Sequence, residues 1–488
     1  MKQNICPIIQ PGFPDKANHV TKPGLTGIRR TLLIGFLGAA VAGLGVVASA
    51  DGAFKELRVA QNQRYLEYHD GTPFFYLGDT AWELFHRLNR EEADRYLKNR
   101  EAKGFTVIQA VVLAELGGLD DPNPYGHTPL VDKDPARPNE AYFQHVDFIV
   151  DRAESLGLVM GMLPTWGNWW KRGDIFTPQN ARAYGRFLGE RYKDKPIIWI
   201  LGGDHNPDND RERALIESMA HGIKEGDGGR HLMTFHPRGP GLSSHYFHEA
   251  DWLDFNMFQS SHAARDHDTG LFADHDYKLE PPKPTLDGEP RYEGIPVGFY
   301  NADADRDLRF DDYDVRQAAY WSLLAGACGH TYGHNSVWQM WQPGRKPVIW
   351  ASTPWHESLD HPGASQMKHV RHLFESRPFH KLVPDQSILL DAPTHGGAKV
   401  RAARATDGSF LFVYSPRGEQ FTVRVNVIRT SRIRQTWYDP RTGAAKVLHT
   451  TDTPGFQTFV PPTSGRGNDW ILVLDDATAG FPAPGQVR

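Results

Sequence analysis

The chain has 488 residues, 40% of them hydrophobic, which suffices for a large core and a second module. Its formal net charge of −5 is small, with both signs dispersed, and no basic run or stripe indicates a nucleic-acid-binding protein. The chain also lacks an internal repeat that would indicate a solenoid.

Residues 1–50 are typical of an export signal. Arg29–Arg30 precede the uncharged run TLLIGFLGAAVAGLGVV, and ASA ends at Ala50 in a small-x-small cleavage pattern. The paired arginines suggest twin-arginine export, although the rest of that motif is imperfect, so the Sec route stays open. A retained anchor is the alternative, but the run is short for a span and diluted by Gly and Ala. We expect cleavage near Asp51 and a periplasmic or secreted protein without stable membrane association, in which Cys328 is the one remaining cysteine.

Short apolar runs then alternate with helical patterns. A helix is predicted from the Asn89–Glu92 capping box to about residue 104, a second over residues 139–157, and a third beginning at Pro178. Eight strands are predicted in PFFYLGDT, FTVIQAVVL, LVMGMLPTW, PIIWILGGD, HLMTFHP, LDFNMFQSS, KPTLDGEP and GHTYGHN. This rhythm predicts a (β/α)8 TIM barrel over residues 54–383. A doubly wound sheet would share the local pattern, but no G-x-G-x-x-G follows the first strand.

The pattern changes after about Pro384. Short alternating strands separated by turn residues are predicted in SILLDA, KVRAARA, SFLFVYSP, QFTVRVNV, RQTWYDP, FQTFVPP and DWILVLDD. We therefore expect a small antiparallel β-sandwich over residues 384–476, packed on the barrel as a support domain. Residues 477–488 are expected to form a loose tail.

Polar and aromatic side chains collect where the predicted barrel strands end. In such barrels, the active site lies at the C-terminal face, where these ends meet. The candidates are Asp79, Glu115, Trp166, Asp204, His236, Gln259, Glu289 and His334.

The run IIWILGGDHNP places a carboxylate directly after a buried strand. On a strand, Ile200, Gly202 and Asp204 share one face, and we expect Gly202 to remove bulk beneath the acid so that a ligand can approach. Ile198 and Trp199 are expected to pack the deeper barrel layers.

A second acid stands in KPTLDGEPRYEG. Pro290 favours an extended Glu289, and Asp287 is expected to share its face one layer deeper. Two carboxylates facing each other across an aromatic cleft is the arrangement that glycoside hydrolysis needs. Whichever carboxyl gives the proton needs a raised pKa, which a partly dry cleft beside a second carboxylate can supply. His205 and Asn206 could hydrogen-bond the Asp204 carboxyl or the substrate.

Three motifs, FYLGDTAWELF, IIWILGGDHNP and LDGEPRYE, resemble those of the apiosidase-like glycoside hydrolases, and the resemblance extends from about residue 54 to 475. It implies a (β/α)8 enzyme with a C-terminal β-sandwich of the type labelled collagen-binding. It also implies Asp204 as acid/base and Glu289 as nucleophile, with no cofactor, and a sugar pocket shaped by Asp79, Trp82, Trp166 and His205. The implied activity is removal of apiose from a side chain of the pectic polysaccharide rhamnogalacturonan II.

Two alternatives stay open. A metal-dependent hydrolase would use clustered histidines such as HYFH and HAARDHD, but no H-E-x-x-H spacing occurs, and the acidic loop of residues 301–314 lacks the EF-hand pattern for Ca²⁺. A non-catalytic carbohydrate-binding barrel is disfavoured because both Asp204 and Glu289 are present. The long segment of residues 114–138 is expected to wall a pocket, which favours exo action on a carbohydrate side chain.

Overall fold

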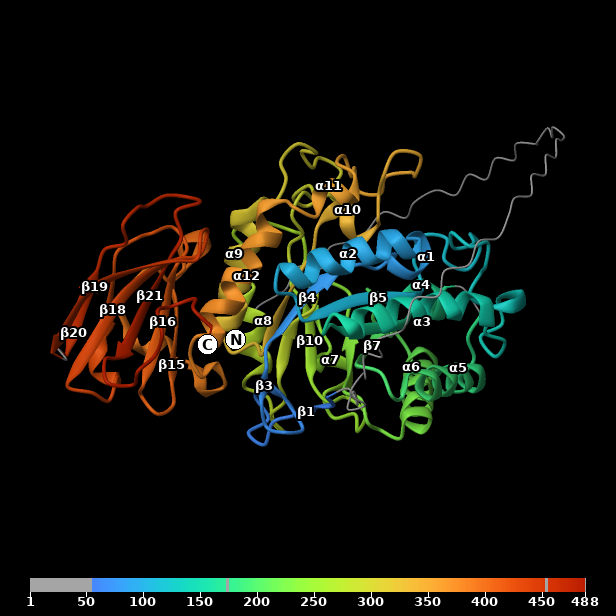
Figure 1. The fold of residues 1–488 in the computed structure, drawn as a ribbon, viewed down its shortest axis with the longest axis horizontal. Helices are drawn as coiled ribbons and strands as arrows, with labels where there is room; N and C mark the ends of the chain where they lie inside the picture. Colours follow the sequence, from blue (N-terminus) through green and yellow to red (C-terminus); the bar gives the residue numbers. More distant parts are fainter. Residues whose placement is uncertain (1–54, 173–174, 453–454, 488) are drawn as a thin grey trace, which may run out of the picture. The chain divides into compact units, whose positions relative to one another are not determined.

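The computed structural model describes residues 55–172, 175–452 and 455–487 (Figure 1). The expected export signal and its cleavage site lie outside these residues. Across the three ranges, none of the helices combines the length and the apolar character that a membrane crossing requires.

The eight predicted barrel strands are confirmed. They are β4 (Tyr76–Thr80), β5 (Val107–Leu113), β6 (Val159–Thr165), β7 (Ile197–Gly202), β8 (Met233–His236), β10 (Asn256–Gln259), β11 (Thr285–Asp287) and β12 (Gly329–Tyr332). They form a parallel sheet in the order β8-β7-β6-β5-β4-β12-β11-β10, and the short β9 (Gly241–Leu242) is added antiparallel to β10. The barrel is nearly closed, because Asp254 N–H donates to Met233 O at 2.9 Å and the Thr234 hydroxyl to Phe255 O at 2.7 Å across the β8/β10 gap.

Helices cover the outside of this barrel (Figure 1). The capping box of Asn89 and Glu92 starts α2 (Arg90–Ala102), as predicted, and Thr177 caps α5 (Pro178–Tyr192), where Pro178 occupies the first turn. The other longer helices are α3 (Glu140–Ser155), α6 (Asp210–Asp227), α8 (Gly270–Asp276), α9 (Asp312–Leu324) and α12 (Pro362–Glu375). Short helices follow several strands: α1 (Leu84–Arg87), α4 (Gly167–Lys171), α7 (Ser244–Phe247), α10 (Asn335–Trp338) and α11 (Trp355–Ser358).

Alternation along β7 separates two cores. Ile198 and Ile200 belong to the cluster inside the barrel, whereas Trp199 belongs to the cluster between barrel and helices, and its Nε1 donates to Asp227 at 3.1 Å. The expectation that Trp199 packs the barrel interior is therefore wrong. It failed because both faces of a parallel strand are buried, so the sequence does not show which face is inside.

The C-terminal region consists of antiparallel sheets, as predicted. One has the order β13-β15-β16-β21-β18-β19 and the other β14-β17-β20. The strands are β13 (Leu382–Pro384), β14 (Leu389–Asp391), β15 (Arg401–Ala405), β16 (Phe410–Ser415), β17 (Phe421–Arg424), β18 (Arg432–Asp439), β19 (Ala444–Asp452), β20 (Phe456–Phe459) and β21 (Trp470–Asp476). No sequence pattern predicted β13, β19 or the strands β1 (Leu57–Val59) and β2 (Leu66–Tyr68) of a small N-terminal sheet. The third strand of that sheet, β3 (Pro73–Phe74), is the first part of the predicted strand PFFYLGDT.

The segment after β21 is packed rather than loose. The Phe481 ring lies 5.7 Å from the Phe410 ring, and the Phe481 carbonyl accepts from Arg434 Nη2 at 3.1 Å. The described part of this segment therefore belongs to the sandwich.

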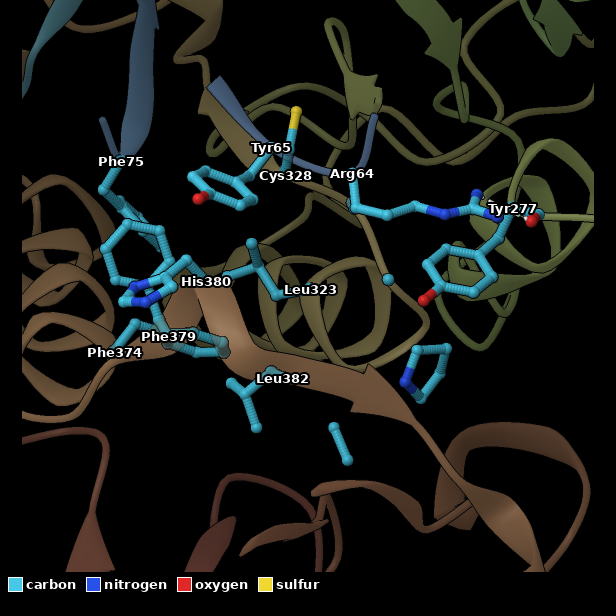
Figure 2. A pocket seen from close by; sticks show the side chains of 14 residues that line it. Arg64, Tyr65, Phe75, Tyr277, Leu323, Cys328, Phe374, Phe379, His380 and Leu382 are labelled. Atoms are coloured by element: carbon cyan, nitrogen blue, oxygen red, sulfur yellow. Dashed lines mark hydrogen bonds between the residues drawn. The ribbon is translucent and has the colours of Figure 1, made fainter. Parts of the chain in front are cut away.

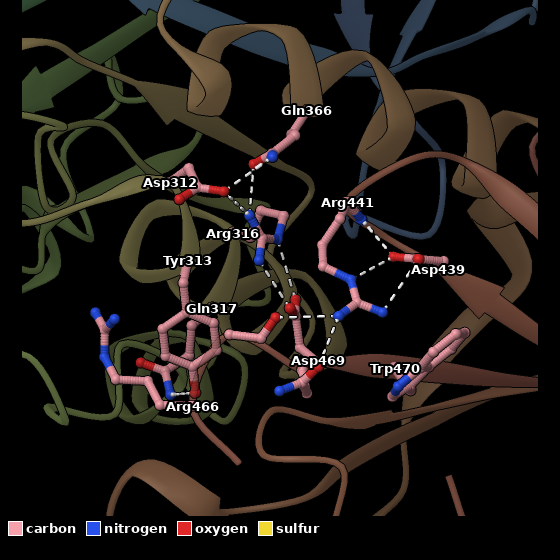
Figure 3. Close-up of polar contacts among 12 residues, drawn as sticks. Asp312, Tyr313, Arg316, Gln317, Gln366, Asp439, Arg441, Arg466, Asp469 and Trp470 are labelled. Carbon is pink, nitrogen blue, oxygen red and sulfur yellow. Dashed lines mark hydrogen bonds and ion pairs between the residues drawn. The ribbon is translucent and has the colours of Figure 1, made fainter. Parts of the chain in front are cut away.

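A buried ion pair joins α9 to the sandwich (Figure 3). The Arg316 guanidinium donates to both Asp469 oxygens, at 3.1 and 2.8 Å, and its remaining nitrogen reaches Gln366 and Asp312. Around it, side chains of α9, α12 and the sandwich share one apolar cluster. The sandwich therefore packs on the barrel helices α9 and α12.

Candidate active site

Three consecutive residues with positive φ end β7. Gly202, Gly203 and Asp204 have φ values of 96°, 84° and 55°, and the last of these is uncommon for a residue with a side chain. A Cβ on Gly202 would collide with the His236 carbonyl oxygen, and one on Gly203 would lie 2.9 Å from the Trp166 Cα. The glycines therefore allow close approach of the protein's own backbone. The expectation that Gly202 makes room for a ligand is wrong.

Glu289 lies just beyond β11, between two imidazoles. Its Oε1 is 3.2 Å from His262 Nε2, and its Oε2 is 3.1 Å from His236 Nε2, the second contact without ideal hydrogen-bond alignment. The side chain is 7% exposed. Two N–H groups on a buried carboxyl favour its ionised form.

His236 also contacts the other predicted acid. Its Nδ1 accepts the backbone N–H of Asp204 at 3.2 Å. Because Nδ1 accepts, the neutral ring carries its proton on Nε2, which is the nitrogen that faces Glu289. One imidazole thus fixes the Asp204 backbone and the Glu289 carboxylate relative to each other.

The two carboxyls have opposite pKa shifts. Burial, followed by the negative charge of Glu289, raises the pKa of Asp204 to about 7, against lowering effects of His236 and Arg238. Burial also disfavours ionised Glu289, but the hydrogen bonds from His236 and His262 outweigh it and lower the pKa of Glu289 to about 2. Near pH 6, the pair therefore holds one proton, which is on Asp204, and Glu289 is ionised.

Aromatic rings form a wall beside the pair. The Trp82 and Trp166 centroids are 5.3 Å apart, and they lie 5.5 and 6.2 Å from the His236 ring. Tyr292 lies with its ring 4.7 Å from His262, and both burial and the Glu289 charge raise the pKa of its hydroxyl. The site therefore combines two acids with flat apolar surfaces.

Glu115 and Gln259 belong to the same site. Burial raises the pKa of Glu115, and the charges of Asp204, Glu83 and Glu289 add to the effect. The loop that carries Glu115 is fixed because the next residue, Leu116, donates its N–H to Glu83 at 2.9 Å. A hydrogen bond from Gln259 lowers the pKa of Asp204 slightly against the burial effect.

Two predicted site residues face the helices instead. Asp79 is fully buried against Arg100, whose Nε is 3.1 Å away, and it accepts a hydrogen bond from Tyr96 of α2. Asp287 accepts from Ser260 at 2.9 Å and from Ser322 of α9 at 3.3 Å. The predicted placement of both acids in the cleft is not what the structure has, because alternation directs these strand positions outward.

His205 and Asn206 fix the loop after β7. His205 Nδ1 lies 3.2 Å from the Gly203 carbonyl, and burial lowers the pKa of this histidine to about 4. The Asn206 side-chain oxygen accepts the N–H of Arg238 at 2.9 Å. These contacts hold the loop that carries Asp204 and do not reach the Asp204 carboxyl, whereas the expected contact with substrate stays a prediction.

His334 caps α10 at the end of β12. Its Nδ1 accepts the Ser336 N–H at 3.1 Å, and its Nε2 lies 2.9 Å from His361 Nδ1. Burial lowers its pKa. Both ring nitrogens are therefore occupied by the protein itself.

Three residues of the site were not singled out from the sequence. Glu83 and Tyr292 stand inside the motifs FYLGDTAWELF and LDGEPRYE, and His262 stands in HAARDHD, whose histidines suggest metal binding and not contact with an acid. Their roles depend on contacts between residues that are distant in the sequence. Glu83 and Tyr292 could have been found because they lie inside the family motifs, whereas no sequence signal marks His262. Within the part of the chain that the structure describes, no group of three or more His, Cys, Asp or Glu residues is arranged to hold a metal ion.

A separate cavity lies between the residues that precede β4 and β12, the helices α9 and α12, and the strands β13 and β15 (Figure 2). Arg64, Tyr65, Tyr277, Cys328 and Phe379 are among its lining residues. None of the predicted site residues lines it. Burial raises the pKa of the Cys328 thiol to about 12, so this cysteine is inert as a nucleophile.

A barrel with two carboxyls of opposite protonation at the C-terminal ends of its strands, among tryptophans, defines a glycoside hydrolase. Solved structures agree with this class. One described as a glycoside hydrolase is 36% identical, with a TM-score of 0.82, covering 88% of this chain and 98% of that one. A glycoside hydrolase family 5 structure from Bacteroides vulgatus is 33% identical, with a TM-score of 0.82 and coverage of 88% and 95%.

The family models are more specific. Residues 60–381 match the apiosidase-like catalytic domain, and the chain belongs to this family. Residues 383–475 match a domain named for collagen binding in a collagenase. A further Bacteroides vulgatus glycoside hydrolase structure, 18% identical with a TM-score of 0.66 and coverage of 88% and 84%, shares the fold. A search of curated proteins found no match.

Proposed function

We propose that this chain is an exported, retaining exo-glycosidase that removes a β-apioside or related furanoside from a pectic side chain. Asp204 is the acid/base and Glu289 the nucleophile. The observation that carries the assignment of roles is the pair of imidazoles at Glu289, with His262 Nε2 3.2 Å from Oε1 and His236 Nε2 3.1 Å from Oε2. They favour an ionised Glu289, and burial beside that charge raises the pKa of Asp204 to about 7. Two interacting carboxyls with separated pKa values assign the proton donor and the anion.

The reaction proceeds in two displacements. The Glu289 carboxylate attacks the anomeric carbon while the glycosidic C–O bond breaks, and Asp204 gives its proton to the departing oxygen. Asp204, now ionised, takes a proton from water, whose oxygen attacks the same carbon and releases Glu289. The His262 hydrogen bond and the His236 Nε2 atom 3.1 Å away stabilise ionised Glu289, which favours it as a leaving carboxylate.

The substrate proposal is tested by turnover of 4-nitrophenyl glycosides. Aryl apiofuranoside, arabinofuranoside and pyranosides are compared, with rhamnogalacturonan II oligosaccharides alongside. We expect apiose release and no pyranoside hydrolysis. Release of another furanose would change the specificity within the same class, and hydrolysis of none of these substrates would contradict the proposed function.

Export is tested on the full-length chain made in a bacterial host. The envelope fraction should contain a protein whose N-terminus lies within a few residues of Asp51. An intact leader retained in the membrane fraction would contradict cleavage.

A further inference from the structure

We propose that Trp350, supported by Arg306, is a binding platform for a pyranose ring of the glycan on the leaving-group side of the scissile bond. The inference rests on the proposed function, because it places the rest of the substrate outside the catalytic pocket. It assigns a role to two surface side chains that the catalytic mechanism leaves unused.

The backbone at Trp350 is unusual. Ile349 and Trp350 have φ values of 47° and 50°, so two consecutive bulky residues occupy the left-handed region. Such conformations are strained for residues with bulky side chains and persist only where the surroundings impose them. In this backbone conformation the two adjacent side chains point in different directions. Ile349 packs against the barrel interior, whereas Trp350 is 38% exposed.

Side chains of neighbouring elements impose the conformation. Gln339 accepts the Val348 N–H at 2.8 Å and donates to the Val348 carbonyl at 2.9 Å. Asn335 donates to the Ile349 carbonyl at 2.8 Å, and Arg309 donates to the Trp350 carbonyl at 3.0 Å. Trp350 is therefore presented on a rigid support and not on a loose loop tip.

The support stands at the catalytic mouth. Asn335 follows the end of β12, and Ile349 packs against the apolar cluster that includes Trp82, Trp166 and Tyr292. Asn335, which holds the Ile349 carbonyl, also donates its backbone N–H to the Glu293 carbonyl at 2.9 Å, four residues after Glu289, so Trp350 stands on the side of the barrel where the strands end.

A second loop meets Trp350 on this side of the barrel. The Arg306 guanidinium lies 4.3 Å from the Trp350 ring centroid. The Arg306 loop starts beside the nucleophile's partner, since the Phe299 ring is 6.0 Å from the His262 ring. Leu308, which is 42% exposed, adds apolar surface on the same loop. An indole with one cation against it and exposed ring surface suits the apolar C–H face of a pyranose.

Acidic neighbours narrow the class of ligand. Asp303, Asp305 and Asp307 surround Arg306 in the sequence, and all three are exposed. Their charges offset those of Arg306 and Arg309, so recognition here depends on ring stacking and not on a sugar carboxylate.

The test uses Trp350→Gly in the full chain. Glycine removes the ring and relieves the left-handed strain, so thermal stability should be unchanged or higher. We expect kcat/KM on a rhamnogalacturonan II oligosaccharide to fall about tenfold, mainly through KM, as loss of an aromatic contact of about 1.4 kcal/mol predicts. Turnover of 4-nitrophenyl apiofuranoside should stay within about twofold, because its leaving group does not reach the platform.

Two variants complete the design. Trp350→Phe should recover most of the oligosaccharide activity. Phe456→Ala is the matched control, since Phe456 is 58% exposed on the sandwich with the Arg424 guanidinium 5.9 Å from its ring, and it should change neither substrate. Equal losses of Trp350→Gly on both substrates, or no loss on the oligosaccharide, would overturn the inference.

A binding measurement separates this inference from the proposed function. If the wild-type chain hydrolyses none of the substrates, titration calorimetry with the same oligosaccharide decides. Binding that weakens about tenfold in Trp350→Gly would support the platform even though the proposed function had failed. Unchanged binding, or no binding by the wild-type chain, would overturn it.

Discussion

Asp204 and Glu289 are connected by a single side chain, since His236 accepts the Asp204 backbone N–H at Nδ1 and faces the Glu289 carboxylate with Nε2. The distances are 3.2 and 3.1 Å. This arrangement couples the position of the proposed proton donor to the ionisation of the proposed nucleophile.

The pH dependence of activity follows from the two pKa values. Glu289 must be ionised, which holds above about pH 2, and Asp204 must be protonated, which holds below about pH 7. We expect kcat/KM to be flat in mild acid and to fall above about pH 7. Asp204→Asn, assayed on an activated aryl glycoside, should lose this alkaline limb. A limb that persists in Asp204→Asn would assign it to another group.

Replacement of His236 by Ala should move the acidic limb. It removes one hydrogen bond that lowers the pKa of Glu289, so the limb should shift from about pH 2 toward neutral and kcat/KM should fall on every substrate. His334→Ala is the control, because that ring sits at a strand end but contacts His361 and Ser336. An unshifted acidic limb in His236→Ala would show that His262 alone sets the ionisation of Glu289.

The β7 turn should tolerate no side chain at Gly203. Gly203→Ala combines a left-handed backbone with a Cβ 2.9 Å from Trp166 Cα, whereas Gly228→Ala has φ of 71° and open space around its Cβ. Gly228→Ala should cost about 1 kcal/mol of unfolding free energy, and Gly203→Ala about 2–4 kcal/mol, because steric overlap adds to the conformational term. Urea unfolding measures both. Equal costs would mean that the neighbouring backbone yields freely.

The fold was more predictable than the orientation of its side chains. Long apolar runs located β5, β6 and β7, because burial of a parallel strand on both faces leaves a continuous apolar signal. Short strands such as β11 and β12 carry little of that signal and were expected from the alternation of strands with helices. Burial on both faces also hides which face is inside, and this is why Asp79 and Asp287 were placed in the cleft. β19 was missed because nearly all of its residues are exposed, so neither alternation nor an apolar run marks it. The contact of His262 with Glu289 joins distant strands, which no local pattern encodes.

The interface between barrel and sandwich should depend on the Arg316–Asp469 pair. Arg316→Met leaves Asp469 buried without its partner, so we expect a loss of about 3–5 kcal/mol of unfolding free energy. Arg186→Met, at an exposed i,i+4 pair with Glu190, should give no measurable change. Calorimetry of the full chain checks both variants. A small loss of unfolding free energy in Arg316→Met would show that Gln366 and Asp312 do not need the guanidinium as a partner. It would also show that Asp469 is then solvated by water or bonded to another donor.

The stereochemistry of the reaction decides the role of Glu289. Two successive displacements at the anomeric carbon retain configuration, and they require carboxyls about 5–5.5 Å apart, whereas an inverting enzyme needs about 6.5–9.5 Å for the intervening water. Glu289→Ala should abolish turnover of every substrate. Asp204→Ala should impair natural substrates far more than activated aryl glycosides, and azide should restore its turnover by resolving the glycosyl-enzyme, because a small anion needs no general base. Proton NMR of the first-formed sugar gives the direct measurement. A first product of inverted configuration would recast Glu289 as a general base acting on water, with His236 and His262 then orienting that base.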